Sequence, residues 1–312
     1  MASARDVEQQ AAALESLRTA PSDAAESGLR KALQHRNNYL VSKAAKLAAD
    51  LSLSALTPDL ATAFTRFLDN PIKTDPQCWA KNAIAKALAT LEYQEHELFL
   101  QGMRHIQLES VWGGSSDTAG NLRSTCALAL VQCRGLNSTR LLTLLTELFA
   151  DKELRVRVNA ARAVEQVGSD AAMLLLRLRA ELASDEPELL GACYSGVLHI
   201  EGPSAIPWAA KFLPHEDDAA AEAAIAIAEA RTPEAFAVLK ESFAHSRDPW
   251  FRTALLSAIA LTRQDEAFTW LLTLIEREDR DSKDAHEALC RSNPPNAILD
   301  RLTQIGQPCR RT

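Results

Sequence analysis

The sequence is poor in glycine and in aromatic residues. It has 11 glycines among 312 residues, and phenylalanine, tryptophan and tyrosine together make up 5% of the chain. Alanine and leucine dominate instead, and both favour helices. Hydrophobic residues make up 47% of the chain and charged residues 24%, a balance typical of globular rather than disordered proteins. The composition therefore favours helices that pack closely through small side chains.

Long apolar segments are also missing. No stretch approaches the ~18 uncharged apolar residues that a membrane-spanning helix needs, and residues 1–18 lack an apolar core of signal-peptide length. The six cysteines include no C-x-x-C pair, and Cys126 and Cys133, seven residues apart, suit packing on one helix face. We therefore expect a cytoplasmic protein without membrane contact, whose cysteines are reduced and mostly buried. We expect no metal and no cofactor.

An excess of basic residues is absent as well. The formal net charge is −7 and the sequence pI is about 5.6. Nucleic-acid binders need basic groups that replace the counterions of the phosphates, so we expect no nucleic-acid partner. The motifs H-E-x-x-H, G-x-S-x-G and the P-loop do not occur. We therefore predict no catalytic residue and expect that the chain is not an enzyme.

What the sequence does contain is an internal repeat. Its clearest copy is residues 151–168, where apolar residues recur on one face of a helix. An acid stands six residues before a base in three copies, at Asp75 and Lys81, Asp117 and Arg123, and Asp151 and Arg157. The matched positions of successive copies are 81, 123, 157, 191, 220 and 252. A period near the low thirties with two helical segments per copy is typical of an α-solenoid.

The repeat predicts the fold class and the domain organisation. We expect an all-α protein, a right-handed α-solenoid of about eight antiparallel helix pairs, with residues 1–312 forming a single domain. Residues 1–21 would hold an N-terminal capping helix, residues 22–295 the repeats, and residues 296–312 a C-terminal capping helix and tail. The second helix of each pair is expected to line a concave inner surface.

The repeated pattern D…(V/L)R…AA.AL resembles HEAT repeats, particularly the short HEAT-like repeats also found in phycobilin lyases. It is clearest at residues 75–168 and 248–262. The resemblance implies an architecture and hardly a function. It also implies that the acid and the base of each copy form a side-chain ladder between neighbouring repeats.

Two families of enzymes also have HEAT-like repeats, and their functional residues can be compared with this sequence. Deoxyhypusine hydroxylases of this type bind two irons through four His-Glu pairs at equivalent repeat positions. Here three such pairs occur at different phases of the repeat, at His96-Glu97, His215-Glu216 and His286-Glu287. Repeat symmetry would not bring them to one metal centre. HEAT-like alkylpurine DNA glycosylases use a basic face, which the acidic balance of this chain disfavours.

Tryptophan occurs twice at one position of the repeat. Trp79 and Trp250 stand two residues before the basic position, away from the apolar helix face, so they should be partly exposed. Tryptophan is enriched in interface hot spots, and we predict that both residues contact a partner. The alternative is that they pack against the preceding turn between helices.

An insertion interrupts the repeat at "LESVWGGSSDTAGNLR", residues 108–123. About eight residues separate Leu108 from Asp117, whereas the next copy has a single residue at this place. Insertions in solenoids fall on one edge, often the binding edge. We predict a loop that binds a partner through three of its residues and one on the following helix: Trp112, Gly113, Gly114 and Arg123. The alternative is that Trp112 fills the gap between turns.

Together these features predict a non-catalytic HEAT-repeat scaffold that binds another protein through its concave face and its inserted loop. The identity of that protein partner does not follow from the sequence. The resemblance implies one alternative, a chromophore-attachment factor similar to the phycobilin lyases.

Overall fold

The computed structural model describes residues 4–309, and its regular structure is almost entirely helical. Contacts divide the chain into two compact units, Met1–Val167 (unit 1) and Gly168–Thr312 (unit 2). Both units are stacks of antiparallel helix pairs, so the predicted all-α helical-repeat fold is confirmed. A single domain spanning residues 1–312 stays a prediction. Within the described residues, no helix is both long enough and apolar enough to cross a membrane.

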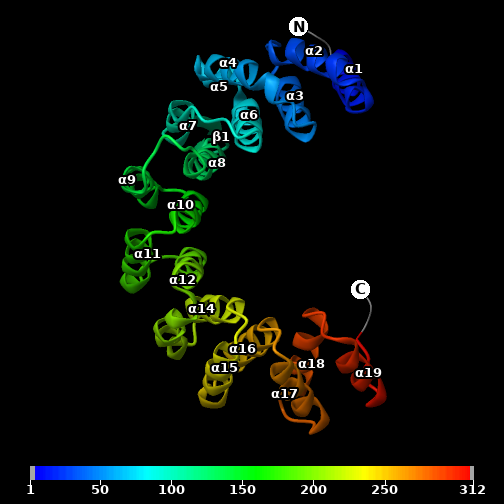
Figure 1. Ribbon diagram of the computed structural model, residues 1–312, viewed down its shortest axis with the longest axis vertical. Coiled ribbons are helices and arrows are strands. Elements are labelled where there is room, and N and C mark those ends of the chain that lie inside the picture. The colour runs from blue at the N-terminus through cyan, green and yellow to red at the C-terminus, as the bar shows by residue number, and fades with distance from the viewer. Residues whose placement is uncertain (1–3, 310–312) are drawn as a thin grey trace. The chain divides into compact units, whose positions relative to one another are not determined.

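Unit 1 begins with a capping helix, which four helix pairs follow. Its helices are α1 (Ala4–Ser16), α2 (Ser22–Leu33), α3 (Asn38–Asp50), α4 (Thr57–Leu68), the short α5 (Pro71–Thr74), α6 (Trp79–Thr90), α7 (His96–Met103), α8 (Gly120–Val131), α9 (Ser138–Phe149) and α10 (Leu154–Val167). The second helices α3, α6, α8 and α10 pack on one another in sequence, and Figure 1 shows them along one side of the unit, with α4, α7 and α9 along the other.

Alanine-rich faces and polar caps explain these helices. In α6, Ala80, Ala85 and Ala87 are buried beside Ile84, so α3 and α8 can approach closely. Asn37 caps α3, because its side chain accepts a hydrogen bond from the Leu40 amide, which would otherwise lack a partner in the first turn. Small residues in the buried layer and caps at the starts thus account for the stacking.

Unit 2 continues the alternation with four more pairs and a last helix. Its helices are α11 (Asp170–Leu182), α12 (Pro187–Glu201), the short α13 (Ile206–Ala209), α14 (Asp218–Glu229), α15 (Pro233–His245), α16 (Pro249–Leu261), α17 (Asp265–Glu276), α18 (Ser282–Arg291) and α19 (Asn296–Gln304). Helices α12, α14, α16 and α18 pack on one another in sequence. The first helix of one pair is irregular, because α13 passes into the 3₁₀ segment η5 (Ala210–His215), which contains Pro214.

The cysteines correct one expectation. Cys290 and Cys309 form a disulfide in unit 2, whereas we expected six reduced thiols. The other four, Cys78, Cys126, Cys133 and Cys193, are free and buried, as expected. Nothing in the sequence spacing of 19 residues indicated the bridge. It forms because the segment after α19 returns to the end of α18.

Candidate partner-binding site

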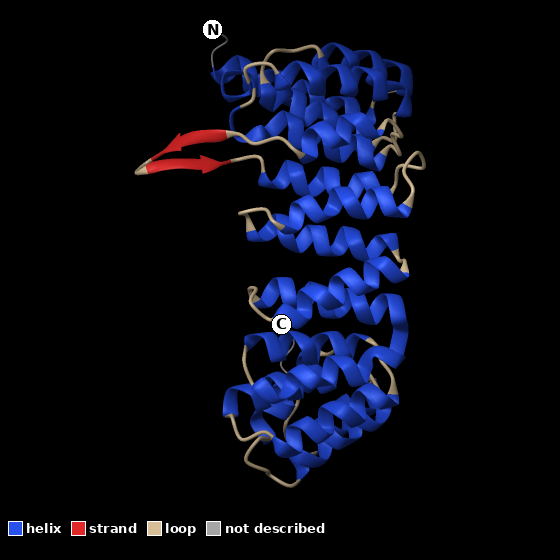
Figure 2. Ribbon diagram, turned by 90° about the vertical axis from the view of Figure 1, so that its left-hand side faces the viewer, coloured by secondary structure: helices blue, strands red, loops and turns tan. Residues whose placement is uncertain are grey.

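The insertion at residues 108–117 is a β-hairpin and not the irregular loop that we expected. Strand β1 (Leu108–Val111) pairs antiparallel with β2 (Gly114–Asp117), with Leu108 opposite Asp117 and Val111 opposite Gly114. Trp112 and Gly113 therefore form a two-residue turn. Gly113 has a φ of +89°, in the left-handed region that suits glycine, whereas the φ of Gly114 lies outside that region. Figure 2 shows this hairpin, the arm, standing away from the helices of unit 1.

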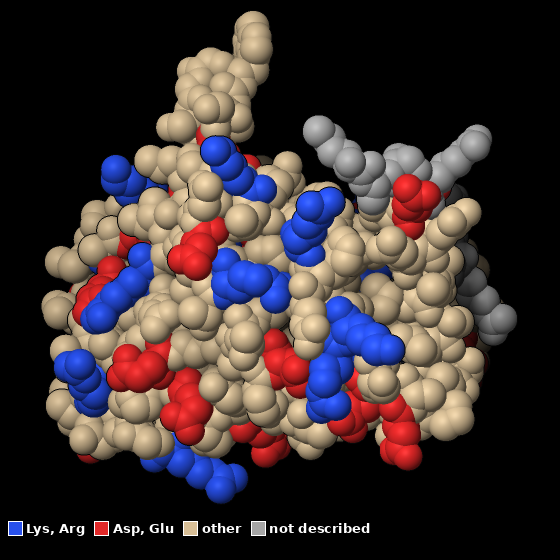
Figure 3. Space-filling view, turned by 90° about the horizontal axis from the view of Figure 1, so that it is seen from above, with Lys and Arg blue, Asp and Glu red and all other residues tan. Residues whose placement is uncertain are grey.

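The outer part of the arm is apolar and exposed. The Trp112 side chain is completely open to solvent, at 104% relative accessibility, and Val111 beside the turn is also exposed. This accessibility shows that the alternative role for Trp112, filling a gap between turns, is wrong. In Figure 3 the arm projects from a surface of mixed charge, and its outer part carries neither acidic nor basic side chains. A completely exposed tryptophan is a residue type enriched in the hot spots of protein interfaces.

The base of the arm is polar and held by many hydrogen bonds. One Glu109 carboxylate oxygen accepts hydrogen bonds from the Gln77 amide (2.6 Å), the Gln107 side chain (2.7 Å) and the Thr118 hydroxyl (2.7 Å). Burial alone would raise the pKa of Glu109. The hydrogen bonds from Thr118, Gln107 and Gln77 outweigh burial and hold the pKa below its usual value. The arm is therefore fixed to the turn that precedes α6.

Arg123 lies beneath the arm and does not reach the surface, where we had placed it. Its side chain is buried and contacts Asp117 at 2.6 Å and Asp151 of the next repeat at 2.7 Å, and also donates to the His105 carbonyl at 3.0 Å. Burial would raise the pKa of Asp117, but hydrogen bonds from the Ala119 and Gln107 amides and from Arg123 lower it. Because these partners occupy the guanidinium, Arg123 positions the last residue of β2.

The predicted side-chain ladder is thus present at Arg123, which joins two repeats. The pair before it is different, because Lys81 and Asp75 are fully buried and contact each other at 3.0 Å within one copy. Asp75 is tied to the preceding repeat by Asn38 (3.0 Å). Arg157 donates to the main-chain carbonyls of residues 151 and 152. The acid–base spacing therefore marks structural residues, some within a repeat and some between repeats.

Two aromatic residues lie next to the anchor of the arm in unit 1. Trp79 opens α6 and is 48% exposed, which agrees with the exposure expected for it. Tyr39, near the start of α3, lies beside it with 6.1 Å between the ring centroids. Since Gln77 bonds to Glu109, the arm is anchored two residues from Trp79. The structure thus adds Tyr39 to the candidate surface.

Trp250, in unit 2, opens the second helix of its pair just as Trp79 does, and it is 50% exposed. The equivalent residue of α12, Leu189, is fully buried. At this position of the repeat, the side chain can therefore be either exposed or buried.

Sequence reasoning missed several residues of the site. Exposed Val111 adjoins the turn and exposed Leu108 lies at the base of β1, while Gln107, Glu109 and Thr118 fix the base. The available signal was the Trp-Gly pair that follows Val111, after a short segment with apolar residues at both ends. It was weak because β2 consists only of glycine, serine and aspartate, which do not favour strands.

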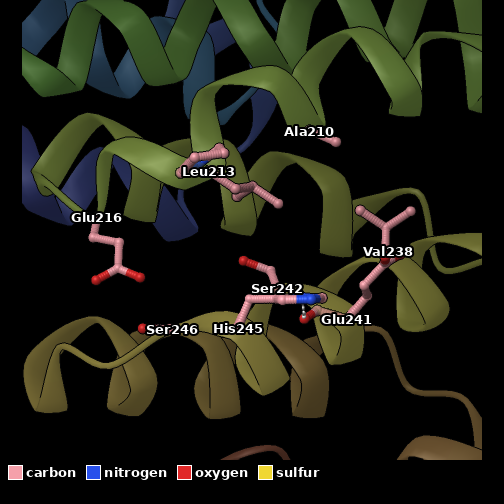
Figure 4. A pocket seen from close by; sticks show the side chains of 9 residues that line it. Ala210, Leu213, Glu216, Val238, Glu241, Ser242, His245 and Ser246 are labelled. Carbon is pink, nitrogen blue, oxygen red and sulfur yellow. Dashed lines mark hydrogen bonds between the residues drawn. The ribbon is translucent and has the colours of Figure 1, made fainter.

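Unit 2 contains a pocket of about 450 Å³ between η5 and α15 (Figure 4). Glu216, Glu241, Ser242 and His245 line it, together with apolar residues. The His245 ring contacts the main-chain carbonyl of Glu241 at 2.9 Å. Among the described residues, this imidazole makes no hydrogen bond to a serine that lines the pocket. None of the predicted site residues lines it.

One group of side chains in residues 4–309 could hold a metal ion. The group of three or more His, Cys, Asp or Glu side chains with converging ligand atoms is His286, Cys290 and Cys309. His96 and Glu97 contact each other at 3.3 Å on α7, whereas His215 ends η5 and His286 lies within α18. Within the described residues, the three His-Glu pairs thus form no common ligand group.

Comparisons with known proteins give little beyond the fold. No family model and no curated protein matches the chain. A solved structure of human deoxyhypusine hydroxylase in complex with glycerol is similar over 94% of this chain and 89% of that chain, with 16% sequence identity and a TM-score of 0.30. We expected that the chain is not an enzyme, and this finding corrects that expectation, because the similar structure is that of an enzyme. A similarity of this size assigns no reaction to the chain.

Proposed function

We propose that the chain is a cytoplasmic repeat protein that binds another protein, and that the arm enters an apolar pocket of this partner. The observation that carries the proposal is the fully exposed Trp112 at the tip of a hairpin whose base is fixed to the repeats. A rigid aromatic group held away from its own domain gains most from burial in a partner, because little conformational entropy is lost.

The chemistry of the arm also indicates the kind of partner. Its outer residues are apolar or small, and both edges of the two-stranded sheet are open. Such a strand edge can add main-chain hydrogen bonds to a protein partner. Trp79 and Tyr39, beside the anchor, would extend the contact onto the repeats. In unit 2, Trp250 and the second helices remain part of the proposed binding surface.

Photo-crosslinking at the tip tests this proposal. A photoreactive phenylalanine analogue at position 112 should crosslink one defined protein in native lysate, and the same analogue at exposed Leu174 in unit 2 should not. The purified partner should then bind Trp112→Ala at least tenfold more weakly, about 1.4 kcal/mol. Equal crosslinking at both positions, or unchanged affinity of Trp112→Ala, would contradict the proposal.

The described residues contain no feature that favours the chromophore-attachment alternative, so we do not propose it.

A further inference from the structure

Three potential metal ligands converge at the C-terminal end of unit 2. His286 and Cys290 are one turn apart on the same face of α18, and Cys309 follows α19 and returns to the same place. Their ligand atoms all lie within 4.8 Å of one another, and each residue is partly exposed. A metal ion could therefore reach all three side chains from solvent.

The geometry at α18 already matches one edge of a zinc site. The Nε2 atom of His286 and the Sγ atom of Cys290 are 3.6 Å apart. In a tetrahedral zinc site, Zn–N bonds near 2.05 Å and Zn–S bonds near 2.3 Å place the nitrogen and the sulfur about 3.6 Å apart. The pair of ligands on the helix is thus spaced for zinc without any movement of the backbone.

Only Cys309 would have to move. Two sulfur ligands of a tetrahedral zinc lie about 3.8 Å apart, so its sulfur must separate from that of Cys290 when the disulfide is reduced. Cys309 follows the last helix in a segment without regular structure, which can make this small adjustment. His286 Nε2 would exchange its contact with the Gln307 carbonyl (2.9 Å) for the metal.

We propose that the reduced chain binds one Zn²⁺ through His286 Nε2, Cys290 Sγ and Cys309 Sγ, with water in the fourth position. A dithiol reductant converts the disulfide to two thiols and is itself oxidised to a disulfide. Zinc then binds the two thiolates and releases two protons. Hydrogen peroxide reverses the change. The two thiolates lose two electrons, form the disulfide and release zinc, while the peroxide takes up these electrons and two protons to give two water molecules. In a reducing compartment the thiol form is expected, and there zinc replaces the disulfide.

The position of the site gives this exchange a structural role. Helix α19 buries only Leu302, and an ion pair between Arg301 and Glu276 (2.7 Å) ties it to α17. So small a buried surface holds a terminal helix weakly. The disulfide and the zinc ion would each join α18 to the segment after α19. The cap of unit 2 would therefore stay attached under both oxidising and reducing conditions.

Cobalt(II), a spectroscopic substitute for zinc, tests the proposal on the full chain. The reduced protein, kept without oxygen, should bind one equivalent of Co²⁺ with thiolate-to-cobalt absorption in the near ultraviolet, and Zn²⁺ should abolish this absorption. His286→Ala and Cys309→Ser should each weaken binding at least tenfold. Cys133→Ala, which removes a buried thiol of unit 1, should bind like the wild type. The oxidised protein should bind no cobalt.

A second measurement does not depend on variants. Zinc should protect Cys290 and Cys309 of the reduced wild-type chain from alkylation, as mapped by peptide mass spectrometry. Absence of stoichiometric cobalt binding, binding that survives both substitutions in folded protein, or alkylation unaffected by zinc would each overturn the proposal. None of these results bears on the arm, so the two proposals can fail separately.

Discussion

At the base of the arm the side chains are polar or charged, at least partly buried and hydrogen-bonded, whereas at its tip they are apolar and lie in water. Glu109 accepts three hydrogen bonds and Arg123 joins two carboxylates. Trp112, only three residues after Glu109, is completely exposed. The arm is therefore held by the repeats at its base and is free of them at its tip. Substitutions at the base should lower the stability of the fold, whereas substitutions at the tip should lower only the affinity for a partner.

Removing the central cation at the base should have the largest effect on stability. Arg123→Met would leave Asp117 and Asp151 mostly buried without their shared partner, and breaking such a buried pair costs about 3 kcal/mol or more. Urea unfolding of the full chain measures the loss. Arg155→Ala is the matched control, since the exposed Arg155 side chain donates to Asn121 at the surface, and it should change stability by less than about 0.5 kcal/mol. Equal effects of the two substitutions would show that the base is not structural.

Acid should weaken the base as well. The pKa values of Glu109 and Asp117 are lowered in the folded chain, so the unfolded chain binds more protons at acidic pH. The resulting stability is present above the unfolded pKa of about 4 and is lost as the pH falls through the folded values. Glu109→Gln should cost about 1 kcal/mol at neutral pH and should flatten the dependence of the unfolding free energy on pH between 5 and 3. An unchanged slope would argue against the carboxylate as the anchor.

The turn offers two adjacent glycines with different conformations. Gly113→Ala places a side chain at φ +89° and should disfavour the hairpin by about 1 kcal/mol, whereas Gly114→Ala meets no atom within 4 Å and should be nearly neutral. Chemical shifts of the β1 and β2 amides report how much hairpin remains. If both variants retain the hairpin equally, the turn is less constrained than this geometry requires.

The fold could be predicted because its signals are local and repeated. Apolar faces at helical spacing, N-cap residues and a period near the low thirties each point to stacked helix pairs. The acid–base spacing indicated the ladder, but it could not tell Arg123, buried by its neighbours, from a surface residue. That distinction depends on the Asp151 side chain of the next repeat and on the main-chain carbonyl of His105, both far from Arg123 in the sequence.

The hairpin and the disulfide could not be predicted for a different reason. Both strands have only four residues, and β2, with glycine, serine and aspartate alone, has almost no β-propensity. The hairpin is held mainly by Glu109, Gln107 and Thr118 at its base. The bridge from Cys290 to Cys309 depends on how the last helix turns back. Both features are set by tertiary contacts that no short window of sequence contains.

The smallest effect on stability is expected at the tip. Trp112→Ala removes a side chain that contacts nothing in the described chain. The free energy of unfolding, measured by thermal unfolding, should therefore change by less than about 0.5 kcal/mol. Trp208→Ala is the contrasting control, because Trp208 is buried against Tyr194 and Phe212 and should cost about 3 kcal/mol. A large loss of stability for Trp112→Ala would place the tip in a structural role.

A shortened arm tests the central claim most directly. Replacing residues 110–115 by Asn-Gly keeps the pair of Glu109 and Ser116 and closes it with a favourable two-residue turn. The measurement is the affinity of this variant for the partner found by crosslinking, with its unfolding free energy as a check on the fold. We predict at least tenfold weaker binding at nearly unchanged stability. Wild-type affinity of the shortened chain would contradict the account, because it would show that the arm takes no part in binding.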